Sequence, residues 1–510
     1  MDLISSNPGS SPSYITNVPN GKETDTQQFL ALDLGGTNLR VCKVNFQGKN
    51  KYSATGKKIE ISEGLKIGKA KDLFGFLANE IKTFLTEGDN ANDFESQPVN
   101  LGLTFSFPVK QIGPNCGLLQ EWTKGFNVKD AIGQDVVKLL QDALDKDEDE
   151  DAPKVSAMRV KCAALVNDAV GVLLTSSYTA EVCKMGSIFG TGTNSAYVEN
   201  VDNIKDLLKP GEYVAAEGGE MIVNTEWGAF DNARLHLPST PFENTLDRMS
   251  INPRSQAFEK IISGMYPGEI TRLILLSLID AAPKPLIFQG FRGKFGSAIT
   301  NQWGLETRVL SRVDEAWNKD ANLDLDLDPP KVRAFYTSER FRNNKDKLDD
   351  VRKVVVEELG FPNQNVEGLE FADQNVSPLD ADIVGWVCHL VVRRAALLGG
   401  VAVAAVLQRT GHASHSTGKD INVGVDGSLI QNYPNFEEMM KESLRHLVGE
   451  DIAKDVKFIQ PKKDNGVDGS GVAGGSCVGA ALGALLAVKA AGKPAEEPAE
   501  NPSRTPQKFV

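Results

Sequence analysis

Apolar stretches of two kinds follow one another along this chain: short strand-like runs and longer stretches with helical spacing. The first strand-like region, Phe29 to Phe46, holds two apolar segments on either side of Gly35-Gly36-Thr37-Asn38, which predicts a β-hairpin. The two glycines can adopt backbone conformations that other residues avoid, so the turn can bring N–H groups up to an anion. Asp33 ends the first strand, where a carboxylate can hold Mg²⁺ directly or through water beside bound phosphates. The hairpin therefore predicts a nucleotide site, although a single Gly-Gly turn also occurs in ordinary hairpins.

The turn differs from the common phosphate-binding motifs. No Gly-Lys-Ser/Thr follows it, and a strand rather than a helix leaves it, so it is neither a Walker loop nor a dinucleotide fingerprint. The pattern recurs, however. Gly186–Val198 again runs from an apolar segment through Gly, Thr and Asn to another apolar segment, and Ile421–Ser428 is a strand that ends in Asp426 and Gly427. The repetition predicts two related halves that close on one nucleotide.

The remaining pattern predicts alternating strands and helices, and so an α/β protein. Helical spacing marks Ala70–Leu85, Asp135–Leu144, Asp380–Gln408 and Ala480–Ala491, and strand-like runs occupy Leu101–Pro108, Val160–Val166 and Asp455–Gln460. The acidic run from Asp145 to Asp151 is expected to be a solvated loop.

Composition narrows the class of protein. A chain of 510 residues with 41% hydrophobic and 24% charged residues is expected to be soluble and to form two or three domains. A net charge of −13 disfavours nucleic acid and anionic membranes as partners and favours a small molecule. The six cysteines are scattered, which signals neither a disulfide framework nor a zinc site. No signal peptide is evident and no apolar run approaches the length of a membrane span, so we expect a cytoplasmic protein.

The candidate base is a carboxylate. None of the five histidines lies in the glycine-rich turns. Asp168 follows the apolar strand 160–166 and Asn167, which places it at the carboxyl end of a strand, where α/β proteins collect functional groups. An Asp in this setting can also simply be a helix N-cap.

Nine motifs now make the chain recognisable. They lie at Leu32–Arg40, Leu103–Pro108, Trp122–Phe126, Val166–Asp168, Ile188–Asn194, Val223–Asp231, Phe258–Lys260, Val425–Ser428 and Asp468–Gly471. In this order they closely resemble the eukaryotic hexokinases, most of all the fungal glucokinases, and the resemblance covers nearly all of residues 15–490.

The resemblance implies an actin-like (ribonuclease H-like) two-lobed α/β fold with a deep cleft between a small and a large domain. It divides the chain into an irregular leader, a small domain, a large domain, a C-terminal helix that returns to the small domain, and a disordered tail. The leader is expected at 1–28, the small domain at 29–166, the large domain at 167–473, the C-terminal helix at 474–491 and the tail at 492–510.

The resemblance also implies roles for individual residues in phosphorylating the 6-hydroxyl of a hexose with ATP. Asp168 is the expected base, assisted by Lys124. The hydrogen-bonding positions around the sugar are Ser106, Thr123, Lys124, Asn167, Asp168, Asn194, Glu226 and Glu259. The nucleotide positions are Asp33, Gly35, Gly36, Thr37, Asn38, Arg40, Thr191, Gly192, Thr307, Ser311, Gly427 and Ser428. Mg²⁺ is expected to arrive with ATP and to reach the protein at most through water to Asp33, with no direct metal ligand.

Three departures from the family pattern stand out. Members commonly carry a helical segment before Pro19, where a short irregular leader is expected here. Ala169 replaces the threonine that usually follows the base. Residues 473–478 look inserted into a Gly-Ser-Gly-Val-Gly-Ala-Ala run, which predicts an extra glycine-rich loop near the nucleotide end of the cleft.

Other classes of protein remain open at this stage. A hexokinase-like regulatory protein would bind the sugar without turning it over, and the insertion favours it. An actin-like or chaperone-like ATPase would leave Trp122–Phe126 unexplained, and the scattered cysteines disfavour a bacterial-type kinase with a zinc site. Taken singly, Lys124, Glu226 and Glu259 could be ordinary exposed charges. We expect an enzyme of the first step of glycolysis, most suited to D-glucose, as a monomer or weak homodimer; its preference among glucose, fructose and mannose does not follow from the sequence.

Overall fold

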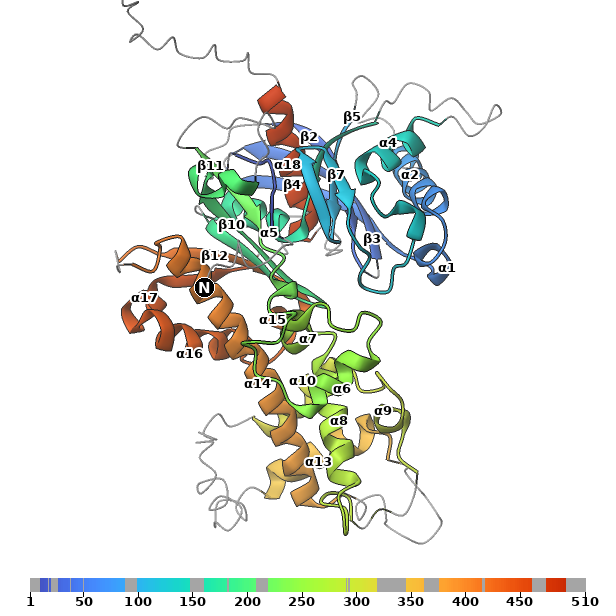
Figure 1. Cartoon of the computed structure of the whole chain (residues 1–510), viewed down its shortest axis with the longest axis vertical. Coiled ribbons are helices and arrows are strands. Elements are labelled where there is room, and N and C mark those ends of the chain that lie inside the picture. Colours follow the sequence, from blue (N-terminus) through green and yellow to red (C-terminus); the bar gives the residue numbers. More distant parts are fainter. Residues whose placement is uncertain are drawn as a thin grey trace, which may run out of the picture.

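The computed structural model shows two lobes joined through two central helices (Figure 1). It describes residues 10–491 except 17, 20–25, 37, 49, 88–98, 147–159, 181–182, 208–218, 290, 292–293, 319–344, 362–375, 415–417 and 461–473. The expected tail 492–510, most of the acidic run and the region 466–473 therefore lie outside the described residues.

The smaller lobe is built on a five-stranded sheet with the order β4-β3-β2-β5-β8. Its strands are β2 (Gln28–Leu34), β3 (Asn38–Gly48), β4 (Lys51–Glu60), β5 (Val99–Phe105) and β8 (Val160–Val166). The predicted hairpin is confirmed: β2 and β3 pair antiparallel with Asp33 opposite Arg40, and the N–H of Gly35 donates to the carbonyl of Asn38 at 3.1 Å.

The larger lobe repeats this arrangement in a six-stranded sheet with the order β1-β11-β10-β9-β12-β13. Its strands are β1 (Ser11–Pro12), β9 (Cys183–Phe189), β10 (Thr193–Asn200), β11 (Glu220–Asn224), β12 (Ile421–Asp426) and β13 (Val456–Ile459). In both sheets three consecutive strands pair antiparallel and two later strands add in parallel beside the first of them. The repeat confirms the prediction of two related halves and of the actin-like fold class.

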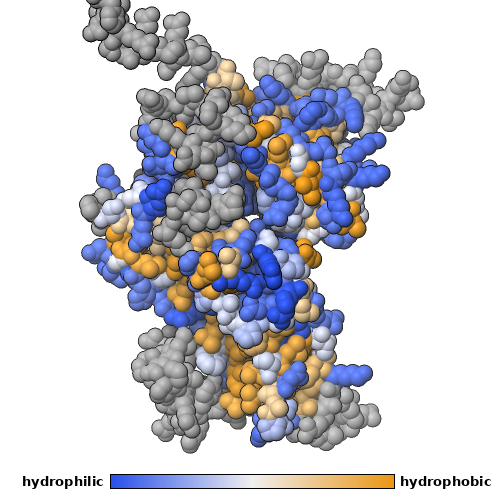
Figure 2. Space-filling model, in the orientation of Figure 1, coloured by the Kyte–Doolittle hydropathy of each residue, from blue (hydrophilic) through white to orange (hydrophobic). Residues whose placement is uncertain are grey.

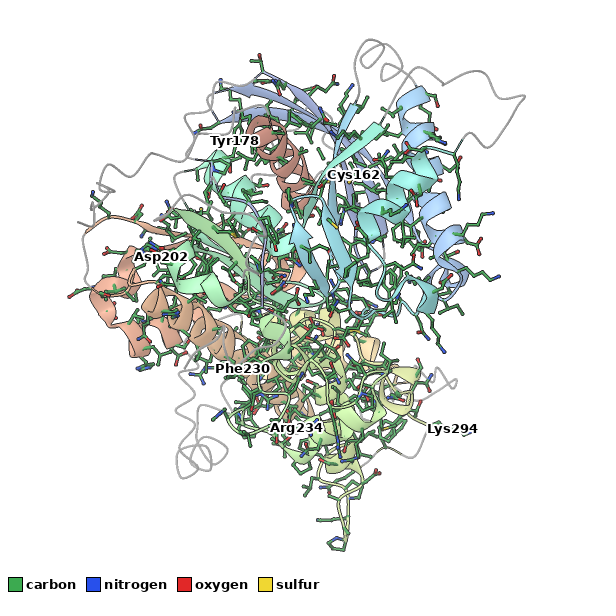
Figure 3. All side chains as sticks on the ribbon, turned by 45° about the horizontal axis from the view of Figure 1, so that its top comes forward. Cys162, Tyr178, Asp202, Phe230, Arg234 and Lys294 are labelled. Carbon is green, nitrogen blue, oxygen red and sulfur yellow. The ribbon has the colours of Figure 1, made fainter. Side chains whose placement is uncertain are left out.

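Two helices fill the space between the sheets. Helix α5 (Asp168–Thr179) packs on β9, β10 and β12, α18 (Gly475–Ala491) packs on β2, β5 and β8, and the two helices contact each other. They cross at glycines: a Cβ added to Gly479 would lie 2.2 Å from the Cα of Gly171. At the far end of α5, Tyr178 lies beside α18 (Figure 3), and its hydroxyl donates to the carbonyl of Lys51 at 3.1 Å. The two lobes therefore share a core.

The outer layer of the smaller lobe covers the other face of its sheet. It consists of α1 (Glu63–Lys66), α2 (Ala70–Thr86), the hairpin β6 (Val109–Gly113) and β7 (Cys116–Leu119), η1 (Lys129–Ala131) and α4 (Val136–Leu144). The apolar residues of α2 recur at helical spacing, and Leu73, Leu77 and Ile81 are fully buried. Asp135 caps α4, because its side chain accepts a hydrogen bond from the N–H of Val137.

The larger lobe extends into a helical subdomain. The remaining helices of the larger lobe, within the described residues, are η2 (Val201–Leu207), η3 (Trp227–Ala229), α6 (Pro241–Met249), α7 (Ala257–Ile262), α8 (Pro267–Ile279), α9 (Ser297–Thr300), α10 (Thr307–Trp317), α13 (Lys345–Glu358), α14 (Pro378–Arg409), α15 (Ser428–Asn432), α16 (Phe436–Val448) and α17 (Glu450–Asp455). Figure 2 shows polar side chains gathered across the middle of the molecule in this view.

Helix α14 corrects one expectation from the sequence. No apolar run was expected to be long enough to span a membrane, yet this 32-residue helix is long and apolar enough by length and composition. The helix is apolar because α8, α10, α13 and α16 pack around it and bury most of its length. Such a helix is typical of the core of a globular protein.

Two further expectations about the chain ends are corrected. The leader 1–28 is not wholly irregular, because Ser11 and Pro12 pair with β11, and the Ser13 hydroxyl donates to the Ile222 carbonyl. The insertion at 473–478 does not form an extra loop over its described part: residues 475–478 are the first turn of α18, which begins five residues before the helical spacing at Ala480 and one residue after the start of the C-terminal helix expected at 474–491. Both segments are ordered by contacts with strands distant in sequence.

The close contact between β5 and α18 gives a stability prediction. A Cβ at Gly102 would lie 1.9 Å from the carbonyl oxygen of Ala480, so Gly102→Ala should destabilise the protein by about 1–3 kcal/mol. Gly75→Ala is the matched control, because nothing lies within 4 Å of a Cβ at this position in α2, and alanine favours the helix. Thermal unfolding of both variants checks this. Equal midpoints for Gly102→Ala and the unmodified protein would contradict the observed packing of α18.

Candidate active site

A cavity of about 450 Å³ lies between the lobes. Its lining contains most of the residues that the sequence singled out: Asp33, Gly35, Gly36, Asn38, Arg40, Ser106, Thr123, Lys124, Asn167, Asp168, Thr191, Gly192, Asn194, Glu226, Glu259, Gly427 and Ser428. Thr37 lies outside the described residues. The fold thus brings together segments separated by up to about 400 residues, because both hairpin turns and the carboxyl ends of several strands face the same space.

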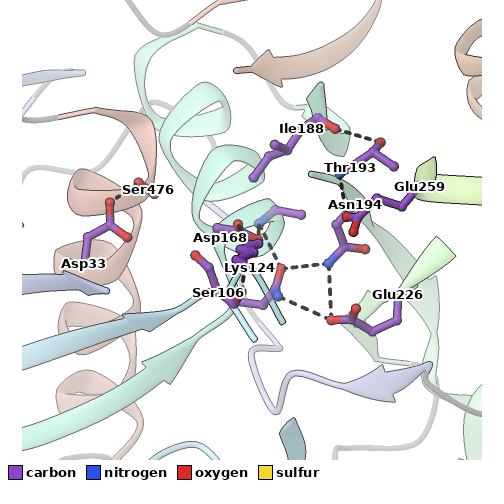
Figure 4. Close-up of polar contacts among 12 residues, drawn as sticks. Asp33, Ser106, Lys124, Asp168, Ile188, Thr193, Asn194, Glu226, Glu259 and Ser476 are labelled. Atoms are coloured by element: carbon purple, nitrogen blue, oxygen red, sulfur yellow. Dashed lines mark hydrogen bonds and ion pairs between the residues drawn. The ribbon is translucent and has the colours of Figure 1, made fainter. Parts of the chain in front are cut away.

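One side of the cavity is a network of amides and a carboxylate (Figure 4). The side-chain amide of Asn194 donates to Asn224 at 2.9 Å, to Asn167 at 3.2 Å and to Glu226 at 3.3 Å. The amide of Asn224 donates to the same Glu226 oxygen at 2.8 Å. The network fixes several hydrogen-bonding groups at set angles, which is what recognition of a polyhydroxylated ligand requires.

Glu226 and Glu259 lie on this side of the cavity. Neither is an ordinary exposed charge, the alternative that remained open for each residue taken singly. Burial raises the pKa of Glu226 to about 7, against the lowering effect of the hydrogen bond from Asn224. Burial also raises the pKa of Glu259, whose Oε2 accepts the backbone N–H of Thr193 at 3.1 Å. Partly buried carboxylates with raised pKa values gather at functional sites, where a ligand can supply the hydrogen bonds that water no longer supplies.

Asp168 and Lys124 lie between the two ends of the cavity. The Lys124 ammonium is 3.9 Å from Oδ2 of Asp168 and donates to the carbonyl of Ser106 at 2.8 Å. The helix N-cap is Asn167, whose side chain accepts the N–H of Ala169 at 2.9 Å, and Asp168 is the first residue of α5. The N-cap alternative for Asp168 is therefore wrong, and its carboxylate lies at the positive end of a helix.

The backbone is strained at three non-glycine residues of this lining. Lys124, Glu226 and Gln256 all have positive φ, of 56°, 47° and 55°. Such conformations cost of order 1–3 kcal/mol each and persist where the surrounding structure imposes them. Their gathering around one cavity indicates that the fold holds these side chains in place for a function.

Glycine-rich turns form another part of the lining. Gly35 and Gly36 come from the β2–β3 turn, Thr191 and Gly192 from the β9–β10 turn, and Gly427 precedes α15. Gly427 has φ of 117°, and a Cβ there would lie 2.5 Å from the backbone of Phe189, so only glycine fits. Backbone N–H groups of such turns are the usual ligands of phosphate groups.

Two carboxylates face these turns. Asp33 is buried and pairs with the guanidinium of Arg40 at 2.9 Å; burial raises its pKa, while Arg40 and the hydroxyl of Ser476 lower it. Burial likewise raises the pKa of Asp426. Within the described residues no three His, Cys, Asp or Glu side chains are grouped to hold a metal ion. This donor set fits a cation that arrives with a polyphosphate and keeps its water, because Mg²⁺ is usually held by one or two carboxylates plus substrate phosphates.

Two predicted nucleotide residues are not in the lining. Thr307 begins α10, where its hydroxyl accepts the N–H of Gly268 at 3.2 Å. Ser311, one turn later, donates to the carbonyl of Asn432 at 3.4 Å. Asn432 ends α15, whose first residue, Ser428, does line the cavity, so α10 lies behind this end of the site.

The sequence did not single out every residue of the site. Asn224 is missing from the predicted set although it links Asn194 to Glu226, and the only signal was its place beside Thr225 and Glu226 in a family motif. Gln256 lines the cavity with positive φ. Ser476, in the presumed insertion, donates to Asp33, and nothing in the sequence pattern indicated this contact.

A sugar-type polar network, a carboxylate and a lysine at the centre, and phosphate-type turns in an actin-like fold together define an ATP-dependent sugar kinase. Comparison with known proteins agrees. Residues 5–178 match one hexokinase family model, and 184–329 and 327–486 match a second. The chain belongs to the hexokinase family, and its reaction is the ATP-dependent phosphorylation of a hexose.

Individual relatives cover most of the chain. The glucokinase of Aspergillus niger is 37% identical over 483 residues, which are 89% of this chain and 86% of the relative. Hexokinase-1 of Saccharomyces cerevisiae is 32% identical over 90% of this chain and 82% of its own length. The solved structure of Schistosoma mansoni hexokinase complexed with glucose is 31% identical, with a TM-score of 0.69 over 93% of this chain and 88% of that one.

Proposed function

We propose that this protein transfers the γ-phosphoryl group of ATP to the 6-hydroxyl of D-glucose, with Asp168 as the base. The observation that carries the proposal is the place of Asp168 in the cavity. In Figure 4, Asp168 lies between Asp33 and Ser476 on one side and Glu226 on the other. It therefore lies between the groups proposed to bind the phosphates and those proposed to bind the sugar. A base at this point can reach a hydroxyl that attacks the terminal phosphate.

The side chains divide the work of the reaction. Asn167, Asn194, Glu226 and Glu259 bind sugar hydroxyls, and Ser106 and Thr123 close the opposite wall. Asp168 accepts the proton of the 6-hydroxyl. At the same time the oxygen of that hydroxyl forms a bond to the γ-phosphorus, and the bond between this phosphorus and the ADP oxygen breaks. The Lys124 ammonium, 3.9 Å from Asp168, supplies positive charge beside the transferring group.

The nucleotide end supports the same reaction. The turns at Gly35–Gly36, Thr191–Gly192 and Gly427–Ser428 hold the phosphates, and Thr307 and Ser311 lie behind the nucleoside. Asp33 would hold, through water, the Mg²⁺ that arrives with ATP, and this ion would offset phosphate charge. Closure of the lobes would exclude water, which could otherwise accept the phosphoryl group.

The proposal extends to the setting of the reaction. Glucose is the first candidate because the solved relative from Schistosoma mansoni is complexed with it. We place the reaction at the entry to glycolysis in the cytoplasm, where reducing conditions suit six free cysteines, five of them buried. A monomer or weak homodimer is the expected assembly.

The test is an assay of ADP release with Mg-ATP and glucose, mannose or fructose; the phosphorylated position of the glucose product is read by a dehydrogenase specific for glucose 6-phosphate, and that of the other two products by NMR. We expect turnover of all three sugars at different rates and 6-phosphorylated product. The alternative that the sequence left open, a sugar-binding regulator, rested on residues 473–478, whose described part forms the first turn of α18 in the cavity wall. It predicts protection against thermal unfolding by glucose without ADP release, and that result would overturn the kinase proposal.

A further inference from the structure

The first turn of α18 makes contacts that the site described so far does not use. The Ser476 hydroxyl donates to Oδ2 of Asp33 at 2.8 Å, and its carbonyl accepts the hydroxyl of Thr104 at 2.9 Å. The carbonyl of Gly475 accepts the hydroxyl of Thr175 at 2.7 Å. The start of this helix is thus tied to β2, β5 and α5 at once.

Packing fixes the same turn from other directions. A Cβ on Gly171 of α5 would lie 3.2 Å from both the Cα and the carbonyl oxygen of Ser476. The next residue, Cys477, is fully buried, with its Sγ 2.9 Å from the Sγ of Cys42 on β3. Because close neighbours lie on several sides, Ser476 has little room to move relative to Asp33.

Asp33 depends on few partners. Arg40 and Ser476 both donate to its Oδ2, and among the described residues no hydrogen bond ends on Oδ1. The Arg40 side chain is 30% exposed, so the ion pair is open to solvent on one side and holds the carboxylate less firmly than an enclosed pair would. The hydroxyl of Ser476 supplies the second fixed point that an Asp rotamer needs.

We propose that Ser476 is a positioning residue for the nucleotide: by holding Oδ2 of Asp33, it turns Oδ1 toward the phosphates of Mg-ATP and their bound water. The inference rests on the proposed function of Asp33. It gives a role to a segment that looked like an insertion in the sequence, because Gly474, Gly475 and Ser476 complete the cavity wall at its phosphate end.

The test compares Ser476→Ala with Ser476→Thr, which keeps the hydroxyl. Binding without turnover is measured as protection against thermal unfolding by Mg-ADP and, separately, by glucose; KM for Mg-ATP and for glucose and kcat are measured beside it. For Ser476→Ala we expect Mg-ADP binding and KM for Mg-ATP to weaken by about 5- to 20-fold, with glucose binding within twofold. Ser476→Thr should stay within threefold of the unmodified protein.

Thr175→Val is the matched control, because it removes the hydrogen bond to Gly475 and leaves Asp33 untouched. It should lower the unfolding midpoint and leave Mg-ADP binding unchanged. The inference is overturned if Ser476→Ala binds Mg-ADP as well as the unmodified protein does, if it behaves like Thr175→Val, or if it binds Mg-ADP more tightly, which would mean that the turn obstructs the site. Absence of turnover in the unmodified protein would count against the kinase proposal alone, since the binding comparison can still be read.

Discussion

Asp168→Asn should lower kcat for glucose phosphorylation by about a thousandfold and leave glucose binding within a few-fold. General bases contribute typically 10²–10⁴-fold, and a thousandfold corresponds to about 4 kcal/mol in the activation free energy. Asparagine keeps the size of the side chain and can still hydrogen-bond the sugar, but it does not accept the proton. The measurement is kcat in the coupled assay together with the shift in unfolding midpoint caused by glucose.

The control for this variant is Asp142→Asn. Asp142 is an exposed residue of α4 that pairs with Lys138 at the surface, so its replacement should change neither quantity. If Asp168→Asn retained kcat within threefold while glucose binding was intact, the base would have to be another group, and the assignment built on the position of Asp168 would be wrong.

Glu226→Gln should weaken glucose binding by about 10- to 100-fold. Hydrogen bonds to charged groups contribute about 1.5–3 kcal/mol, and each 1.4 kcal/mol is a factor of ten in affinity. Glutamine preserves the shape and one oxygen for Asn194 and Asn224, so the network around it should survive. Titration with glucose measures the loss.

The same variant should change how stability depends on pH in the absence of sugar. Burial raises the pKa of Glu226 from 4.5 to about 7. Between these two values the folded protein keeps a proton that the unfolded chain has lost, so rising pH lowers the free energy of unfolding, by at most about 3 kcal/mol, and the loss is complete above pH 7. Glutamine does not titrate, so Glu226→Gln does not undergo this loss of unfolding free energy. Its stability relative to the unmodified protein should therefore increase between pH 5 and pH 8.

Thermal unfolding of Glu226→Gln and of the unmodified protein at pH 5 and pH 8 tests this pH dependence. Glu220→Gln is the matched control, because Glu220 lies at the exposed end of β11, the strand that leads to Glu226. A difference in midpoint between Glu226→Gln and the unmodified protein that did not change with pH would show that Glu226 is already ionised in the folded protein at low pH.

Local patterns in the sequence were sufficient for several elements. The β2–β3 hairpin, the strand that ends at Asp426 and the helices α2 and α4 follow from short-range alternation, helical spacing and glycine-rich turns, because each is decided by neighbours in the chain. Family motifs carried the prediction further, to most residues of the cavity lining. Motifs name the residue types at a site, since a reaction fixes which chemistry must be present.

Long-range contacts explain what the sequence did not supply. The order of Ser11–Pro12 depends on pairing with β11, some 210 residues away, and the apolar length of α14 has meaning only when its packed neighbours are known. Asn224 and Ser476 lie at the site because strands and helices that are distant in sequence meet there. Local sequence patterns do not predict such long-range contacts.

The sequence by itself determined the family, the two-lobed fold and the chemistry gathered in its motifs, because turn conformations and reacting groups depend on residue type. The tertiary structure alone decided that burial raises the pKa of Glu226 and that the hydroxyl of Ser476, at the start of α18, donates to Asp33. Burial and long-range hydrogen bonds are properties of the folded arrangement, and they exist only once segments distant in the chain have been packed together.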